Sequence, residues 1–165
     1  MIIALHGKDS SSKKSYTIQK LLIDDRLKDE TVYALDYNSD DSYEKIRESL
    51  IENVEYIMKG HSDYSITFVG LSLGGFWAKH LANFYKERAV LVNPSISYYG
   101  EFEEDDVDTP LIILLGLNDE VVNPQITIDR YQNRAKLVIT DGDHRMHEYF
   151  DEIVKEIIFI RDLYY

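Results

Sequence analysis

Residues 66–75, which read ITFVGLSLGG, decide the fold. The first four form a short, largely apolar run typical of a buried strand, and helical spacing of apolar residues follows the last glycine. Between these segments lies the pattern Gly-x-Ser-x-Gly, with Ser72 at its centre. This order predicts a sharp turn that holds the Ser72 side chain clear of a sheet, because Gly70 and Gly74 leave room for crowded backbone. The alternatives are a structural glycine-rich turn or a phosphate-binding loop, although the Lys-Ser/Thr of a P-loop is missing.

Strand and helix alternate outward from this turn in both directions. Short runs rich in Val, Ile and Leu predict six strands, at 1–5, 31–35, 66–69, 89–92, 111–115 and 136–139. Helical spacing predicts the segments between them, at 14–27, 42–58, 75–87, 124–133 and 146–163. Because near-continuous apolar strands separated by helices form parallel sheets covered on both faces, we expect a three-layer α/β/α sandwich with about six mainly parallel strands. No repeat or low-complexity linker divides the chain, so we expect a single domain over 1–165.

Two further side chains lie where a serine nucleophile would need them. His144 is in a turn directly after the last predicted strand. Asp119 follows the strand predicted at 111–115, and its neighbour Glu120 is the alternative acid. Because the carboxyl ends of parallel strands share one edge of a sheet, we expect Ser72, Asp119 and His144 to meet there as nucleophile, acid and base.

Backbone N–H groups at the same edge would stabilise a developing oxyanion. The first candidate donor is Leu73, at the start of the predicted helix, and the second is Lys8, in the loop LHGKD after the first strand. Tyr98, Tyr99 and Phe102 come from the segment where a lid would lie. They either line an apolar acyl pocket or pack the loop itself.

Composition limits the class of protein. Of 165 residues, 44% are hydrophobic and 29% charged, as in ordinary folded proteins, and the absence of cysteine excludes thiolate chemistry. Without a run of about 20 apolar residues or a signal peptide, a cytoplasmic protein with no membrane partner is expected. The net charge of −12 argues against a nucleic-acid partner and disfavours polyanionic substrates. Lys8, Lys13 and Lys14 could override this locally, but we interpret them as a solvated helix start.

Five motifs, in order and in register, resemble the YqiA-like esterases, a small-sized branch of the α/β-hydrolase superfamily. These motifs are LHG, VGLSLGG, LVNPS, LLGLNDEVV and GDHRM, and together they span nearly the whole chain. The resemblance implies an α/β-hydrolase fold, a carboxylic ester or thioester hydrolase, the triad Ser72, Asp119 and His144, and no cofactor or metal. It also implies that Asn93 and Pro94 shape the site wall. The segment between Pro94 and Pro110 is shorter than in relatives, so little or no cap is expected.

The sequence therefore predicts a serine hydrolase that cleaves a small acyl ester or thioester through an acyl-enzyme intermediate. One alternative is a catalytically silent relative that uses the same fold to bind a ligand. Another keeps the triad but cleaves amides or deacetylates carbohydrates. A flavodoxin-like binding protein is the structural alternative, and no oligomeric state is predicted.

Overall fold

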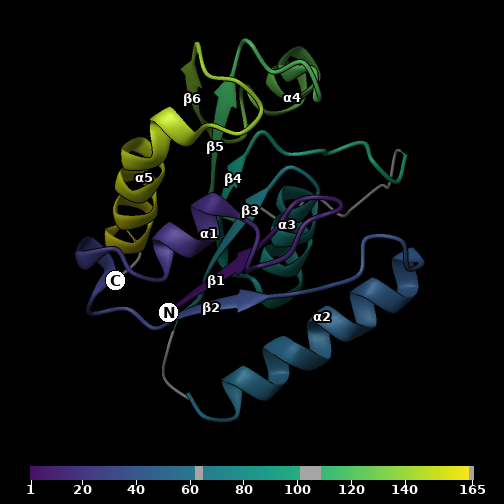
Figure 1. Cartoon of the computed structure of the whole chain (residues 1–165), viewed down its shortest axis with the longest axis vertical. Coiled ribbons are helices and arrows are strands. Elements are labelled where there is room, and N and C mark those ends of the chain that lie inside the picture. Colours follow the sequence, from purple (N-terminus) through teal and green to yellow (C-terminus); the bar gives the residue numbers. More distant parts are fainter. Residues whose placement is uncertain (62–64, 101–108, 164–165) are drawn as a thin grey trace.

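Six parallel strands form one sheet in the computed structural model, which describes residues 1–61, 65–100 and 109–163 (Figure 1). Within these residues the strand order is β2-β1-β3-β4-β5-β6, and every neighbouring pair is parallel. The strands are β1 (Ile2–Leu5), β2 (Val32–Leu35), β3 (Thr67–Leu71), β4 (Arg88–Val92), β5 (Leu111–Gly116) and β6 (Lys136–Thr140). All six predicted strands are confirmed, with ends that differ by one or two residues.

The helices follow the predicted alternation, with two changes at capping residues. They are α1 (Tyr16–Leu21), α2 (Tyr43–Met58), α3 (Leu73–Tyr85), α4 (Pro124–Tyr131) and α5 (Phe150–Asp162). The prediction of one helix over 14–27 is wrong, because this segment divides into α1 and a 3₁₀ turn, Asp25–Leu27. The Asp24 side chain caps the 3₁₀ turn by accepting a hydrogen bond from the Arg26 N–H. The helix predicted at 146–163 also starts with a 3₁₀ turn, because Met146 has a left-handed backbone.

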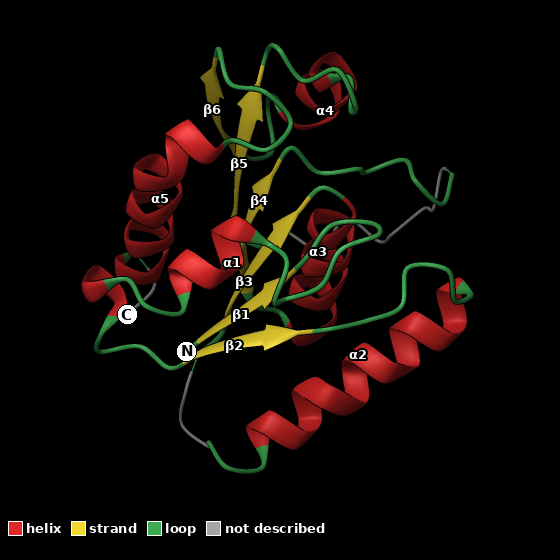
Figure 2. Ribbon diagram, in the orientation of Figure 1, coloured by secondary structure: helices red, strands yellow, loops and turns green. Residues whose placement is uncertain are grey.

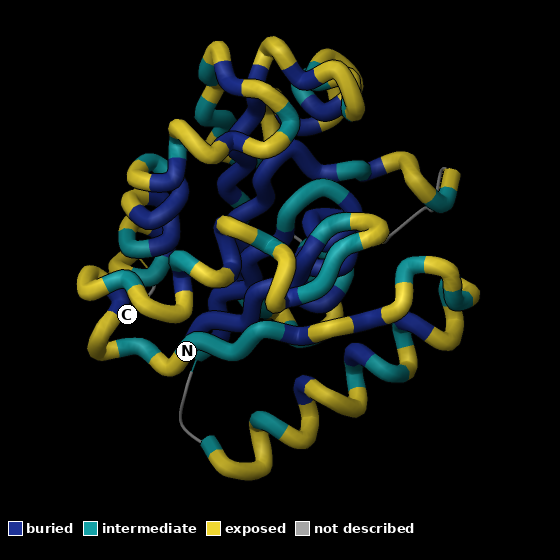
Figure 3. Tube along the Cα trace, viewed as in Figure 1, coloured by how far each residue is buried: buried dark blue, intermediate teal, exposed yellow. Residues whose placement is uncertain are grey.

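Helices cover both faces of the sheet, which confirms the predicted three-layer sandwich (Figure 2). The helices α1 and α5 pack on one face with Ile2 and Ala4, and α2, α3 and α4 pack on the other with Ile3 and Leu5. This division follows from the alternation of side chains along a strand. Figure 3 shows the central strands buried and the outer sides of the helices exposed. No helix of the described residues has the length and apolar character needed to cross a membrane.

The order of the strands identifies where the sheet offers a binding crevice. From β1 the chain passes outward to β2 and then returns to β3 on the other side of β1. In open parallel sheets, ligands bind beyond the carboxyl ends of the strands at such a reversal of direction. The loop that begins at Gly7 leaves β1 at this point, and Ser72 leaves β3 beside it. The predicted nucleophile and one predicted oxyanion donor therefore flank the same crevice.

Candidate active site

Ser72 lies at the junction between β3 and α3 in a strained backbone conformation, with φ of 53° and ψ of −118°. Such a conformation costs about 1–3 kcal/mol in a residue other than glycine, so the surrounding contacts must impose it. The Ser72 N–H donates to the Val92 carbonyl at 2.9 Å, and the Ser72 carbonyl accepts from Gly75 at 2.9 Å and from Ser95 at 3.0 Å. These bonds tie the turn to the end of β4.

Gly74 allows the first turn of α3 to approach β1 closely. A Cβ atom at Gly74 would collide with the backbone carbonyl oxygens of Leu5 and His6. The second glycine of the Gly-x-Ser-x-Gly pattern is therefore required by backbone packing. It brings the start of α3, where Ser72 and Leu73 lie, against the end of β1.

His144 and Asp119 form a hydrogen-bonded pair at the same edge of the sheet. The distance between His144 Nδ1 and Asp119 Oδ2 is 2.7 Å, and the side chains are 22% and 0% exposed. The other oxygen of Asp119, Oδ1, accepts from the N–H groups of Val121 and Val122 at 2.8 Å each. Because the carboxylate accepts from Nδ1–H, the neutral imidazole keeps Nε2 unprotonated and able to take a proton. The alternative acid, Glu120, is exposed.

Asn93 holds the acid loop and the histidine loop together, a role that the sequence did not reveal. It is 1% exposed, and its Oδ1 accepts from the Gly116 N–H at 2.8 Å. Its Nδ2 donates to the carbonyl oxygens of Asp143 and His144 at 2.9 and 3.2 Å. The amide therefore uses acceptor and donors to join the ends of β4 and β5 to the loop after β6. The signal in the sequence was its place directly after a strand, at the edge that carries the other site residues.

Ser95 is a second site residue that sequence reasoning missed. Its Oγ lies 3.2 Å from Ser72 Oγ, within hydrogen-bond distance. Among the described residues no hydrogen bond joins Ser72 to His144, so the serine hydroxyl has Ser95 as its partner here. In unliganded enzymes such catalytic hydrogen bonds are often long and form only with substrate. Both Ser72 and His144 nevertheless line the same pocket, which has a volume of about 560 Å³.

The pocket lies over the switch in strand direction and is built from four segments. Its lining residues come from 7–10, 14–17, 71–72 and 144–145, together with Val121 and His147. Each segment follows a strand or starts a helix at the carboxyl edge of the sheet. No group of three potential metal-ligating side chains occurs within the described ranges.

His6 fixes the peptide that carries one of the predicted oxyanion donors. It is fully buried, and its Nε2 accepts from the Tyr37 N–H at 3.3 Å. Its Nδ1–H therefore donates to the Gly7 carbonyl, at 2.7 Å. Because the peptide is planar and trans, holding the Gly7 carbonyl also fixes the direction of the Lys8 N–H. In the part of the chain that the structure describes, neither Lys8 nor Leu73 has a backbone N–H with an acceptor.

Two of the three predicted substrate residues, Tyr98 and Tyr99, are among the described residues. The Lys8 ammonium lies 5.4 Å from the centre of the Tyr98 ring, and the hydrogen bond with Tyr98 is the main cause that raises the Lys8 pKa above its ordinary value. Tyr99 packs against Phe76 and Trp77, with ring centres at 5.1 and 5.5 Å. Phe102 lies outside the described residues. Neither Tyr98 nor Tyr99 is among the described residues that line the pocket.

Comparison with known proteins relates the chain to one family. The model of the family described as Uncharacterised protein family (UPF0227) matches residues 1–109. The UPF0227 protein YcfP of Escherichia coli is 24% identical, with 84% of this chain and 86% of YcfP covered. These findings confirm the family resemblance that the five motifs indicated.

Solved structures confirm the fold. A serine hydrolase homologue of the alpha-beta class from Coxiella burnetii has a TM-score of 0.77 at 17% identity, covering 99% of this chain and 85% of that one. The Pyrococcus furiosus esterase has a TM-score of 0.75 at 18% identity, covering 96% and 78%. Est1E from Butyrivibrio proteoclasticus has a TM-score of 0.73 at 19% identity, covering 96% and 86%. The chain therefore has the α/β-hydrolase fold.

Proposed function

We propose that this chain, which belongs to the UPF0227 family, is a serine hydrolase that cleaves small carboxylic esters or thioesters. The observation that carries the proposal is the convergence of two loops on one pocket. The strained serine Ser72 and the imidazole of His144 both line it, and the buried carboxylate of Asp119 holds the far side of that imidazole. This convergence of three side chains distant in sequence supports acyl transfer by an activated serine as the chemistry of the pocket.

The chemistry follows from the positions of these groups. His144 Nε2 takes the proton from Ser72 Oγ as that oxygen attacks the acyl carbonyl carbon, and the carbonyl electron pair moves onto its oxygen. The N–H groups of Leu73 and Lys8 stabilise that oxyanion. When the tetrahedral intermediate collapses, the imidazolium gives its proton to the leaving alcohol or thiol, and the acyl group remains on the serine. Water then attacks the acyl-enzyme with His144 again as the base, and the acid is released.

Ser95 has a place in the resting state of this cycle. Ser72 Oγ lies 3.2 Å from Ser95 Oγ, in a hydrogen bond in which either hydroxyl can be the donor, and the Ser72 proton must point to His144 before attack. Since the Ser95 N–H also binds the Ser72 carbonyl, Ser95 restrains the backbone of the nucleophile throughout the reaction.

The names of the structural neighbours support an ester substrate. The Pyrococcus furiosus protein and Est1E are both described as esterases, and Est1E has a solved structure with ferulic acid bound. Their identity to this chain is below 20%, so their activities enter here only as support for the proposal. The carboxylic ester is the part of the proposal that rests on them.

A fluorophosphonate probe tests the proposal, because only an activated serine reacts with it appreciably. We expect mass spectrometry to find the probe on Ser72, and Ser72→Ala to abolish both labelling and hydrolysis of p-nitrophenyl butyrate. Ser49→Ala makes the same change on α2 and should leave both signals intact. Wild-type labelling or turnover in Ser72→Ala would refute the proposal. Parallel rates on aminoacyl amides and acetylated sugars would reveal a peptidase or a deacetylase.

A further inference from the structure

The pocket at Ser72 has a charge opposite to that of the whole protein. The chain carries 30 acidic and 18 basic side chains, for a net charge of −12. The pocket, in contrast, is lined by the cations Lys8, Lys14 and Arg145. Asp9 is the one acidic side chain among the described lining residues. Positive charge is therefore concentrated where the substrate would bind, on a surface that otherwise repels anions.

The three cations of the pocket come from separate segments and have no acidic partner of their own. Lys8 follows β1, Lys14 precedes α1, and Arg145 follows the base His144. All three are exposed, and none forms an ion pair within the described residues. Several other basic residues of the chain do form such pairs, as Lys45 does with Asp41 at 2.8 Å. Lys14 and Arg145 are thus available to a ligand, whereas the Lys8 ammonium also contacts Tyr98.

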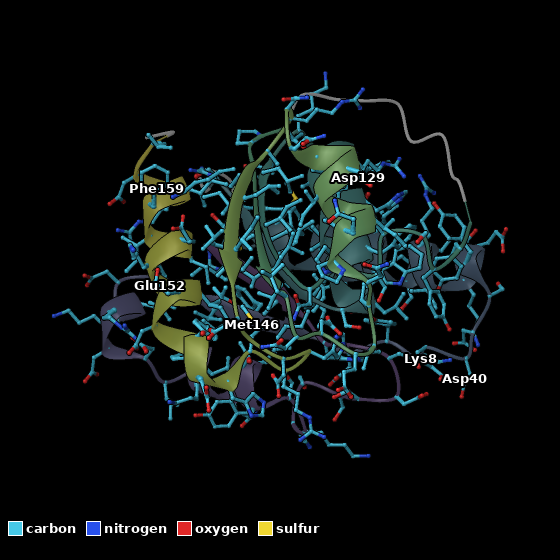
Figure 4. The ribbon with its side chains drawn as sticks, turned by 90° about the horizontal axis from the view of Figure 1, so that it is seen from above. Lys8, Asp40, Asp129, Met146, Glu152 and Phe159 are labelled. Atoms are coloured by element: carbon cyan, nitrogen blue, oxygen red, sulfur yellow. The ribbon has the colours of Figure 1, made fainter. Side chains whose placement is uncertain are left out.

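Three carboxylates act on the charges of the pocket, and two of them accept hydrogen bonds within their own loops. Asp9 Oδ1 accepts from the Ser39 hydroxyl at 3.5 Å, and its N–H donates to the same hydroxyl at 3.1 Å. Asp143 Oδ1 accepts from the backbone N–H groups of Arg145 and Met146 at 2.9 Å each. Asp40 contributes to the field at Lys8 without forming an ion pair, and Figure 4 shows Lys8 and Asp40 close together at the edge of the molecule. These carboxylates weaken the positive potential of the pocket, but none of them forms an ion pair with Lys8, Lys14 or Arg145.

We infer that the pocket selects an anionic ester, that is, an ester or thioester whose acyl or alcohol part carries a carboxylate or phosphate group near the scissile carbonyl. This inference rests on the proposed function, because it places the anion in the pocket that Ser72 and His144 line. Neutral esters are hydrolysed by the same machinery, but with lower efficiency.

The position of the anion along the ester remains open to two arrangements with the same chemistry. The leaving oxygen must lie within reach of His144, since the imidazolium delivers its proton there. Arg145 is the next residue, so an anionic alcohol part would meet Arg145. We assign an anionic acyl part to Lys14, which lines the pocket from a different segment. The two arrangements require separate probes.

Paired esters that differ in one charge test the inference. The acyl pair is the mono-(4-nitrophenyl) ester of glutaric acid and its methyl ester, and the alcohol pair is 4-acetoxybenzoate and its methyl ester. Each kcat/KM is divided by the rate of hydroxide-catalysed hydrolysis of the same ester, which removes intrinsic reactivity. We expect the anion to be preferred up to about fivefold in at least one pair, because one exposed charge pair contributes up to about 1 kcal/mol. The preference should decrease with added salt.

Charge-neutral variants attribute the preference to the pocket. Arg145→Gln should lower the ratio of anionic to neutral kcat/KM about threefold in the alcohol pair, or Lys14→Gln in the acyl pair. The triple variant with Lys8→Gln, which removes all three pocket cations, should bring both ratios close to one. Lys59→Gln, which removes the same charge after the end of α2, should leave the ratio unchanged. An effect of Arg145→Gln confined to the alcohol pair, or of Lys14→Gln confined to the acyl pair, locates the anion.

The outcomes separate this inference from the proposed function. If neutral and anionic esters are hydrolysed with equal corrected efficiency in both pairs, and Ser72→Ala abolishes both rates, the inference is wrong and the proposed function stands. A preference that survives in the triple variant without Lys8, Lys14 and Arg145 would also overturn it. If no ester of either pair is hydrolysed in a manner that depends on Ser72, the proposed function fails and the inference fails with it.

Discussion

Asn93→Asp isolates the two hydrogen bonds that hold the histidine loop. The change keeps the size of the side chain and the oxygen that accepts from Gly116, but it replaces the donor Nδ2 with a carboxylate oxygen. That oxygen would face the carbonyl oxygens of Asp143 and His144, which the amide now binds at 2.9 and 3.2 Å. Aspartate also tolerates the positive φ of 43° at this position, so backbone strain does not confuse the comparison.

The expected loss of stability follows from the bonds removed. Each buried acceptor left without a donor costs about 1–3 kcal/mol, so Asn93→Asp should lower the free energy of unfolding by about 2–4 kcal/mol. For a chain of this length that corresponds to a decrease in Tm of about 5–15 °C. Because His144 loses a backbone anchor, the rate of fluorophosphonate labelling at Ser72 should also fall at a temperature where the variant is folded.

Thermal unfolding followed by circular dichroism measures the effect of Asn93→Asp. Asn133→Asp makes the same charge change at an exposed position and serves as the control. The loss of unfolding free energy in Asn93→Asp, relative to the wild type, should become smaller as the pH falls. Protonation of the new carboxyl group restores an O–H donor for one of the two carbonyl oxygens. A change in unfolding free energy within about 0.5 kcal/mol, with unaltered labelling, would refute the bridging role of Asn93.

Three other changes test the remaining parts of the site. Asp119→Asn should leave the fold intact but lower turnover by up to about 10⁴-fold, because the amide no longer selects the required tautomer of His144. The backbone N–H groups of Met146 and Arg145 hold the pKa of the Asp143 carboxyl below its usual value. The stability that Asp143→Ala removes should therefore be constant above about pH 5 and shrink below about pH 4, in urea titrations of both proteins. Gly74→Ala should lower Tm by several degrees or prevent folding, because its methyl group meets backbone.

Each of these three predictions has a result that contradicts it. Turnover of Asp119→Asn near the wild-type value would transfer the role of the acid to Glu120. A stability difference for Asp143→Ala that stays the same from neutral to acidic pH would show that the carboxylate charge contributes nothing to the loop. A fully stable Gly74→Ala would mean that the start of α3 is not packed against β1 as described. Gly60→Ala, at a site where a Cβ has room, controls for the loss of glycine.

Much of the fold could be predicted, because it depends on patterns local in the sequence. Apolar runs located all six strands, and their separation by helical segments identified the parallel sheet. The division of the helix predicted at 14–27 was missed, because it depends on side-chain caps at Ser15 and Asp24 that compete with helix continuation. The Gly-x-Ser-x-Gly pattern selected Ser72, and a position soon after a strand selected Asp119 and His144 as site candidates.

The supporting contacts of the site could not be read from the sequence. Asn93 binds groups 23 to 51 residues away, and no periodic pattern records which loop a polar side chain will reach. Ser95 approaches Ser72 only because the ends of β3 and β4 are adjacent in the sheet. The lysines after β1 were interpreted as a solvated helix start, since Arg145 joins Lys8 and Lys14 only once the chain has folded.

The backbone angles of Ser72 have a consequence for how this protein could change over time. At φ of 53°, glycine would occupy position 72 without steric penalty. Serine at this position therefore makes the folded chain less stable than glycine would. If selection acted on folding stability alone, substitutions at position 72 would accumulate toward glycine, and the hydroxyl group would be lost. Homologues that keep serine at this position are therefore under a selection pressure other than stability.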